Sequence, residues 1–292
     1  MMKKDKNLNT KRSSLAKKNI QKFMRNRMAV IGGTVMLLII FACVFAPLLT
    51  SWDPTFCDPS QRELPCSAEH LLGTDRVGRD IFARILYGGR TSIMIGVGCA
   101  LGAGLLGTIL GCIAGFFGGK VDAVLVFIQE LFATFPQLLL ILLFSAYVGG
   151  SIANIFIIFI ATSWTGTMRV VRSNIMALKQ EPFAESCRAN GISNRSIMFH
   201  HLLPNTLGSV IVSMTLTVSG FILTEASLCY LGVGIPSEIP TWGNIINAAK
   251  RMDIILNMPT LWLAPGLAIG LFSLSVNFFG DGLRDVFDPT AQ

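Results

Sequence analysis

Two acidic residues, Glu130 and Glu225, lie within long runs of uncharged and mostly apolar residues. An ionisable side chain in such a run is costly to bury in a membrane, so it is a functional candidate by default. Both are therefore candidates for functional residues, such as ones that line a cavity or form a gate. Glu225 precedes Leu231 by about 9 Å along a helix, so its carboxylate could instead reach the membrane surface. For Glu130, a place in a cavity and a hydrogen bond to a neighbouring helix are equally consistent with the sequence.

Sulfur and imidazole groups offer a second kind of chemistry. Of the seven cysteines, only Cys57 and Cys66 lie in a segment expected outside the cell. A disulfide between them is possible there, although spacing alone does not establish its geometry. Adding His70 gives the spacing C-x8-C-x3-H, which is poor for zinc. No metal site is predicted.

The sequence contains no phosphate-binding loop of the form G-x4-G-K-[ST]. Its nearest approach, GFFGGK at 115–120, lacks both the spacing and the hydroxyl residue that cradle a nucleotide. No Ser/His/Asp set or carboxylate pair indicates catalysis either. The chain is therefore predicted not to be an enzyme and to bind no cofactor.

Composition determines the class of protein that holds these residues. The chain has 292 residues, of which 52% are hydrophobic and 14% are charged, whereas soluble domains carry about 25% charged residues. This excludes a soluble enzyme, a disordered chain and a disulfide-stapled miniprotein. The net charge of +7 is confined to segments outside the apolar runs, so it concerns membrane topology and not nucleic acid. We predict an all-α, polytopic membrane protein.

Six membrane-spanning segments are predicted from the uncharged runs and their breaks. A cleaved signal peptide fits the first run poorly, because its 22 uncharged residues exceed the usual apolar length of about 7–15. The predicted spans are 28–49, 91–119, 123–147, 152–166, 207–231 and, within 254–280, a helix from about 261. The corresponding regions are a basic arm (1–27), the first span (28–50), an outer segment (51–90), a core (91–281) and a tail (282–292).

Charge predicts the orientation of these spans. Ten of the first 27 residues are Lys or Arg, and with the N-terminus inside, 17 Lys and Arg lie inside against 7 outside. An excess of these residues marks the cytoplasmic side. Both termini and the loop 167–206 are therefore expected in the cytoplasm.

Two further patterns concern packing. Gly107, Gly111 and Gly115 repeat at a spacing of four, which predicts close approach of a neighbouring helix. In 76–87, apolar residues fall on one helical stripe and Arg76, Arg79, Asp80 and Arg84 on the other face. This predicts an amphipathic helix on a membrane surface, and a small packed loop domain is an equally good interpretation.

The loop 167–206 is predicted to form two short helices joined at Gly191. Pro182 suits the first turn of one helix, and Ser193 can cap the next. Glu185 favours the positive end of the first helix, and Pro204 is expected to end or kink the second. A rigid helical elbow beneath the membrane suits transmission of force to a soluble partner, and a passive connector is the alternative.

The run Glu185-Ser-Cys-Arg-Ala-Asn-Gly191, with Ile197, His201 and Leu203-Pro204-Asn205, resembles the EAA loop of bacterial ABC-importer permeases. The chain departs from that pattern at Ser186 and Cys187, which are both still small. The resemblance implies that this loop couples to an ATPase. The coupling residues that it implies are Phe183, Ala184, Glu185, Ser186, Cys187, Arg188, Gly191, Ile192, Ile197, His201, Leu203 and Pro204.

Further motifs resemble the oligopeptide/dipeptide/nickel permease family, and the basic arm with the first span resembles the second, C-type permease of such pairs. The motifs are LGTDRVGRDIFAR (72–84), YGGRTS (87–92), EASLCYLGVG (225–234), PTWG (240–243), NFFGDGLRD (277–285) and DP (288–289).

The resemblance implies a type I ABC importer permease fold with six transmembrane helices in a bacterial cytoplasmic membrane. The implied partners are a sister permease, two ATPase subunits with ATP and Mg²⁺, an extracytoplasmic substrate-binding protein, membrane lipid and a peptide substrate. A nickel importer is the alternative within the family, although none of the three histidines lies in a span. A secondary transporter would need two related halves, which are not evident. A membrane enzyme has no catalytic set.

Overall fold

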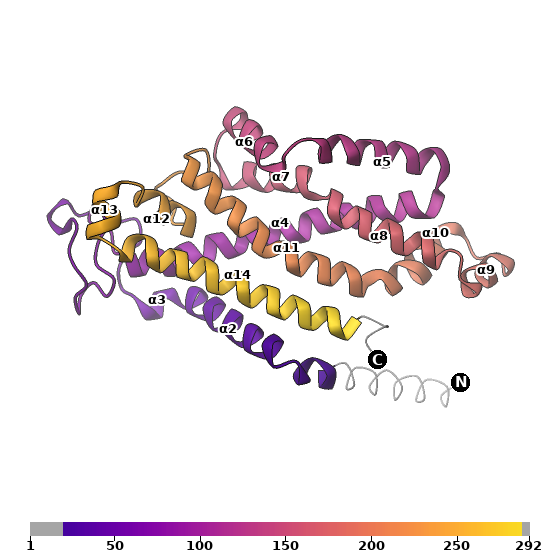
Figure 1. Cartoon of the computed structure of the whole chain (residues 1–292), viewed down its shortest axis with the longest axis horizontal. Coiled ribbons are helices and arrows are strands. Elements are labelled where there is room, and N and C mark those ends of the chain that lie inside the picture. Colours follow the sequence, from indigo (N-terminus) through magenta and orange to yellow (C-terminus); the bar gives the residue numbers. More distant parts are fainter. Residues whose placement is uncertain (1–19, 288–292) are drawn as a thin grey trace.

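The computed structural model describes residues 20–287, so most of the basic arm 1–27 and the end of the C-terminal tail lie outside the described residues. The structure is a bundle of long helices that run along its longest axis (Figure 1). In chain order the elements are α2 (Arg27–Val44), α3 (Ala46–Leu49), η1 (Pro59–Gln61), α4 (Ile81–Phe117), α5 (Gly119–Thr134), α6 (Gln137–Val148), α7 (Ile152–Ser163), α8 (Thr165–Leu178), α9 (Pro182–Ala189), α10 (Asn194–Ser196), the π-helical turn η2 (Ile197–Leu202), α11 (Leu203–Leu231), α12 (Trp242–Ala248), α13 (Met252–Asn257) and α14 (Thr260–Phe287).

Five helical stretches are long and apolar enough to cross a membrane. They are α2, α4, α7 with α8, α10 to α11 including η2, and α14, and the bent pair α5 and α6 makes a sixth if it counts as one span. Within residues 20–287 the β-type pairing is a single isolated bridge between Thr74 and Asp80. The predicted all-α membrane fold is confirmed.

Helix α4 corrects the prediction of an amphipathic helix over 76–87. The helix starts only at Ile81, where the carboxylate of Asp80 caps it by accepting the Ala83 N–H at 2.6 Å. The preceding residues are fixed in a turn, because the Asp75 carboxylate accepts the Arg79 N–H at 3.0 Å and Gly78 has a φ of +82°. Residues 50–80 therefore form a packed loop without this helix.

The glycine row of α4 packs against α8, as predicted. A Cβ on Gly107 would lie 2.5 Å from the carbonyl oxygen of Trp164, and one on Gly115 would lie 2.8 Å from that of Arg172. Only glycine lets the two backbones approach this closely in lipid.

The predicted third span, 123–147, is not one straight helix. Helices α5 and α6 meet at an angle of 84°. Phe135 lies before Pro136 and has extended backbone angles, φ −93° and ψ 139°. A residue before proline is sterically driven out of the helical region, so the helix breaks there.

Two helices extend further along the chain than the sequence predicted. Helices α7 and α8 form one stretch of 27 residues, so the connection that was expected from residue 167 begins only after Leu178. Helix α14 continues through Phe287, beyond the predicted end of the core at residue 281. In both cases the helix continues into charged sequence because it still packs, α8 against α4 and α14 against α2.

The main core lies between α4, α7, α11, α12 and α14. Its large buried side chains include Phe159, Ile222, Trp242 and Phe272. In Figure 1, α12, α13 and the loop before α4 lie at one end of the molecule, and α9 and the corner between α4 and α5 lie at the other.

The possible disulfide between Cys57 and Cys66 is not formed in the structure, where both thiols are free and exposed. The Cys57 thiol donates instead to the Thr55 carbonyl at 3.5 Å. Cys57 lies just before η1, whereas Cys66 lies between Leu64, whose carbonyl accepts the Thr74 N–H at 3.2 Å, and Ser67, whose N–H donates to the His70 carbonyl at 2.8 Å.

Candidate functional site

Helix α9 forms the part of the molecule that extends furthest beyond the ends of α5 and α8 (Figure 1). Pro182 occupies its first position, where a missing N–H costs nothing, and Glu185 lies in its first turn. Arg188 lies in the last turn. Both charges therefore suit the helix dipole, as the sequence predicted for Glu185.

One small residue holds α9 to the bundle. Ala184 is fully buried in a cluster with Phe116 of α4, Ile175 of α8 and Ile197 of η2. Cys187 and Ile192 are half-buried at the edge of this cluster. One face of α9 thus contacts three helices, namely the end of α4, the end of α8 and the beginning of the 194–231 helix.

Gly191 ends α9 in a Schellman motif. Its own N–H donates to the Arg188 carbonyl at 3.0 Å, and the Ile192 N–H donates to the Cys187 carbonyl at 3.1 Å. Gly191 has a φ of +72°, in the left-handed region that this motif requires. Ser193 then caps the next helix by accepting the Ser196 N–H at 3.4 Å. The predicted end of the first helix at Gly191 and the predicted cap at Ser193 are both present.

Pro204 does not end the second helix. Residues 194–231 are one continuous helical stretch, in which the π-helical turn η2 lies immediately before Pro204. Pro204 has no N–H to donate, and the Asn205 side chain donates to the His201 carbonyl at 2.7 Å. A π-helical turn is a known way to continue a helix across such a defect.

The twelve residues predicted for the coupling site divide into two groups. Six face the bundle and are buried or half-buried, namely Ala184, Cys187, Ile192, Ile197, His201 and Leu203. Six are exposed, namely Phe183, Glu185, Ser186, Arg188, Gly191 and Pro204. The exposed group offers an aromatic ring, two opposite charges and a hydroxyl on a fixed helix, which is suitable chemistry for binding another protein.

Glu225 is completely buried, which excludes the interpretation that its carboxylate reaches the membrane surface. Ser92 of α4 donates its hydroxyl to one carboxyl oxygen at 3.2 Å, and the Cys229 thiol donates to the other at 3.1 Å. The Trp242 N–H donates to the Ser92 hydroxyl at 3.1 Å. Among the described residues no Lys, Arg or His forms an ion pair with this carboxyl.

The backbones of the helices and loops around Glu225 approach one another closely, at positions where glycine leaves room. A Cβ on Gly243 of α12 would lie 2.6 Å from the Ala226 Cα, and one on Gly88 of α4 would lie 3.1 Å from the Thr241 backbone. Glu225 therefore lies at a tight junction of α4, α11 and the start of α12.

Glu130 belongs to a different surface. Its side chain is exposed on α5, and the structure does not bring it to the Glu225 junction. The neighbouring buried residue on α5 is Gln129.

Sequence reasoning missed the role of Arg84, which was placed on the polar face of the predicted helix but is only 2% exposed. Its guanidinium donates to the Pro54 carbonyl at 3.0 Å and to the Ser237 carbonyl at 3.2 Å. Beside it, His70 and Asp80 pair at 2.8 Å, both nearly fully buried. Arg84 thus joins the outer loop to the segment before α12, and no local signal could have indicated contacts so far away in the chain.

Comparison with known proteins is consistent with this architecture. Residues 107–292 match the family described as binding-protein-dependent transport system inner membrane component. Residues 14–65 match the N-terminal TM domain of oligopeptide transport permease C.

Several curated relatives cover almost the whole chain. A dipeptide transport system permease protein DppC of Alkalihalophilus pseudofirmus is 39% identical over 91% of this chain and 86% of the relative. An oligopeptide transport system permease protein OppC of Bacillus subtilis is 34% identical over 97% of this chain and 92% of the relative. A putative peptide permease of Brucella suis is 34% identical over 94% and 91%. Together with the bundle and its α9 elbow, these matches show that the chain belongs to the family of inner-membrane components of binding-protein-dependent transport systems.

Proposed function

We propose that this chain is the C-type permease subunit of an ATP-driven importer of dipeptides or oligopeptides. The observation that carries the proposal is α9, a short exposed helix fixed at the base of the continuous 194–231 helix. A helix held by Ala184 on one side leaves Phe183, Glu185 and Arg188 free to bind a partner. The names of the relatives support peptides as the transported class.

The partner at α9 is an ATPase subunit, with ATP and Mg²⁺ on that subunit. This chain has no phosphate-binding loop of its own, so the energy of ATP must arrive through a protein contact. The ATPase contacts the exposed face of α9 and displaces this helix when it changes conformation. The turn η2 with Pro204 transmits that displacement to α11. An importer of this kind has two ATPases, one for each permease.

The substrate path lies between this chain and a sister permease. Small and hydroxyl residues form one stripe along α11, at positions 209, 213, 217, 220, 224 and 227. All six are exposed or half-exposed, and the stripe spans about 27 Å, close to the thickness of the hydrocarbon core. Such a face suits a path between two subunits better than contact with lipid tails.

The end of the bundle that carries α9 faces the cytoplasm in this proposal. The beginning of α2, which follows the basic arm, lies toward that end in Figure 1. The excess of Lys and Arg in the arm supports the same orientation. The opposite end, with α12, α13 and the loop 50–80, then receives the extracytoplasmic substrate-binding protein.

The proposal is tested by changing the exposed face of α9 without touching its buried face. Phe183→Ala combined with Glu185→Lys should reduce co-purification of the ATPases with the tagged permease and reduce uptake of a labelled dipeptide. Asn194→Ala, on the exposed start of α10, serves as the matched control and should do neither. If the double variant retains ATPase subunits and uptake at the control level, α9 is a passive connector and the coupling proposal is wrong.

A further inference from the structure

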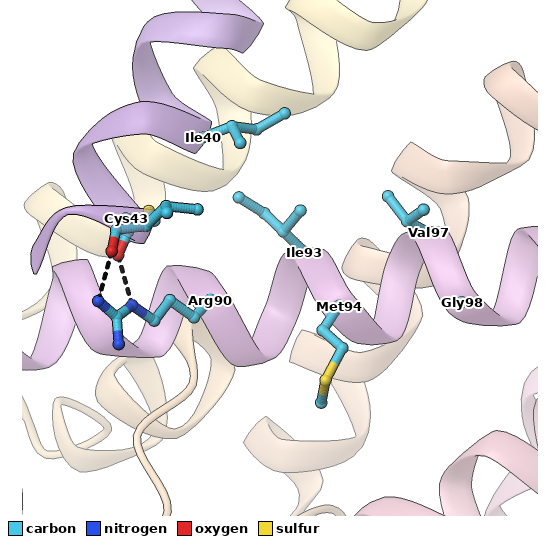
Figure 2. Close-up of a pocket in the computed structure, with 8 residues that line it drawn as sticks. Ile40, Cys43, Arg90, Ile93, Met94, Val97 and Gly98 are labelled. Atoms are coloured by element: carbon cyan, nitrogen blue, oxygen red, sulfur yellow. Dashed lines mark hydrogen bonds between the residues drawn. The ribbon is translucent and has the colours of Figure 1, made fainter.

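An apolar groove runs between α2 and α4, with a single charged residue at one end (Figure 2). Its volume is about 680 Å³, within the range of about 300–1,000 Å³ that is typical of ligand pockets. The walls are Ile40 and Val44 of α2 and Ile93, Met94 and Val97 of α4. The charged residue is Arg90.

Arg90 has capacity for a further partner. Its Nε donates to the Cys43 carbonyl at 2.5 Å and one terminal nitrogen donates to the Val44 carbonyl at 2.6 Å, so it closes the end of α2. Its other terminal nitrogen points away from these carbonyls in Figure 2. No carboxylate of the described residues forms an ion pair with Arg90, and the Tyr87 ring lies 4.7 Å from the guanidinium carbon. Its positive charge therefore has no anionic partner in this part of the chain.

The depth of Arg90 in the membrane follows from the length of α2. The 18 residues from Arg27 to Val44 span about 27 Å, so the last carbonyls of α2 lie near the boundary of the hydrocarbon core. Arg90 is held at that level. From Arg90 to Val97 the groove continues about 10 Å further along α4, into the core.

We propose that this groove binds an anionic phospholipid, with its phosphate at Arg90 and an acyl chain along Ile93 and Val97. An apolar channel with one cation at the membrane boundary is complementary to an amphiphile with an anionic head. A guanidinium also has the planar donor geometry that suits phosphate oxygens. A helix of the sister permease would fill the apolar part but would leave the charge of Arg90 unmatched.

The test uses the complete importer, this chain with its sister permease and ATPases, purified in detergent. Native mass spectrometry should show retained phosphatidylglycerol during titration, with weaker binding of phosphatidylcholine. Arg90→Gln should weaken phosphatidylglycerol binding about fivefold, the effect of one basic residue at a charged membrane surface. Val97→Trp, which fills the groove without changing charge, should weaken binding of both lipids. Arg76→Gln, an exposed arginine on the outer loop, is the matched control and should bind as the unaltered chain does.

Two outcomes overturn the proposal. One is equal retention of phosphatidylglycerol by Arg90→Gln, Val97→Trp and the control. The other comes from a photo-reactive amino acid placed at Val97: cross-linking to lipid supports the proposal, whereas cross-linking to the sister permease shows that a protein helix occupies the groove. Arg90→Lys separates charge from folding, because lysine keeps the charge but cannot donate to both carbonyls in the same way. It should retain the preference for phosphatidylglycerol.

Discussion

The Ser92 hydroxyl donates a hydrogen bond to Glu225 at 3.2 Å, although 133 residues separate the two in the chain. The same hydroxyl accepts the Trp242 N–H at 3.1 Å. One serine of α4 therefore connects the buried carboxyl of α11 to the first residue of α12. This relay fixes the position of the short helix α12 relative to the two long helices.

The first prediction concerns this carboxyl. Glu225→Ala should lower the stability of the purified permease pair by about 1–3 kcal/mol, because it leaves the buried Ser92 hydroxyl without its acceptor and opens a cavity. The measurement is thermal unfolding in detergent. Thr224→Ala is the control, since that hydroxyl donates only to the Gly220 carbonyl of its own helix at 2.8 Å. Equal melting temperatures for the two variants would show that the Glu225 junction adds no stability.

The second prediction concerns the turn after α9. Gly191→Val should weaken retention of the ATPases and reduce dipeptide uptake, because a left-handed backbone costs about 1–2 kcal/mol for a residue with a side chain and more for a β-branched one. Nothing lies within 4 Å of the position that a Cβ would take, so strain and not a clash is the cause. Co-purification and uptake are measured together.

The matched variant for this position is Gly191→Asn. Asparagine tolerates the left-handed region, so it should restore most of the coupling. Ser186→Ala removes only a hydroxyl that donates to the Pro182 carbonyl at 3.0 Å on the exposed face, and it should be nearly silent. A valine variant that couples as well as the asparagine variant would contradict the assigned role of the turn.

The third prediction concerns Arg84. Arg84→Met should loosen the outer loop, because it removes the donor to the buried carbonyl of Pro54 and one donor to the carbonyl of Ser237, which Arg79 also contacts at 3.3 Å. The cost should be about 2 kcal/mol, the penalty for leaving such groups unsatisfied. Faster proteolysis of the segment 50–80 in spheroplasts is the readout. Arg76→Met should have little effect, since the Arg76 and Glu63 side chains pair at 3.6 Å on the exposed surface.

The fourth prediction concerns topology. Single cysteines at Ser60 and Ser237, in a background without native cysteine, should react with a membrane-impermeant thiol reagent in intact cells. A cysteine at Asn194 should react only after the cells are opened. All three positions are exposed in the isolated chain, so access depends on the side of the membrane. Labelling of a cysteine at position 194 in intact cells would contradict the proposed orientation.

The fifth prediction concerns Cys57 and Cys66. Both thiols are free and exposed, so both should be alkylated in oxidised membranes without added reductant. Mass spectrometry of the tryptic peptides gives the result. Modification that requires prior reduction would show that the two cysteines are bridged after all.

Features set by nearby residues could be predicted from the sequence. The Ser193 cap, the left-handed Gly191 and the Gly107 to Gly115 packing row depend on local geometry or on a spacing of four, and all three are present. The start of α4 was misjudged because apolar spacing suggested a helix through a turn that Asp75 holds. That turn depends on hydrogen bonds which a helical stripe does not reveal.

Features set by distant contacts could not be predicted. The burial of Glu225 depends on Ser92 and Trp242, and the burial of Arg84 depends on Ser237. Pro136 is visible in the sequence and predicts a break, but the 84° angle between α5 and α6 follows from what each helix packs against. The groove at Arg90 needs the end of α2 to meet α4, which no local pattern specifies.

The unbroken course of α11 limits how this subunit can move. Pro204 and Glu225 lie about 32 Å apart along one continuous helix, which has no proline between them that would interrupt its hydrogen bonds. A helix without such a break cannot absorb a rotation between its ends. A probe pair spanning Pro204 and Glu225 should therefore report a constant separation throughout turnover. During a transport cycle, α11 must therefore change its orientation within the bundle as a rigid unit. A single tilt angle then determines the positions of both Pro204 and Glu225.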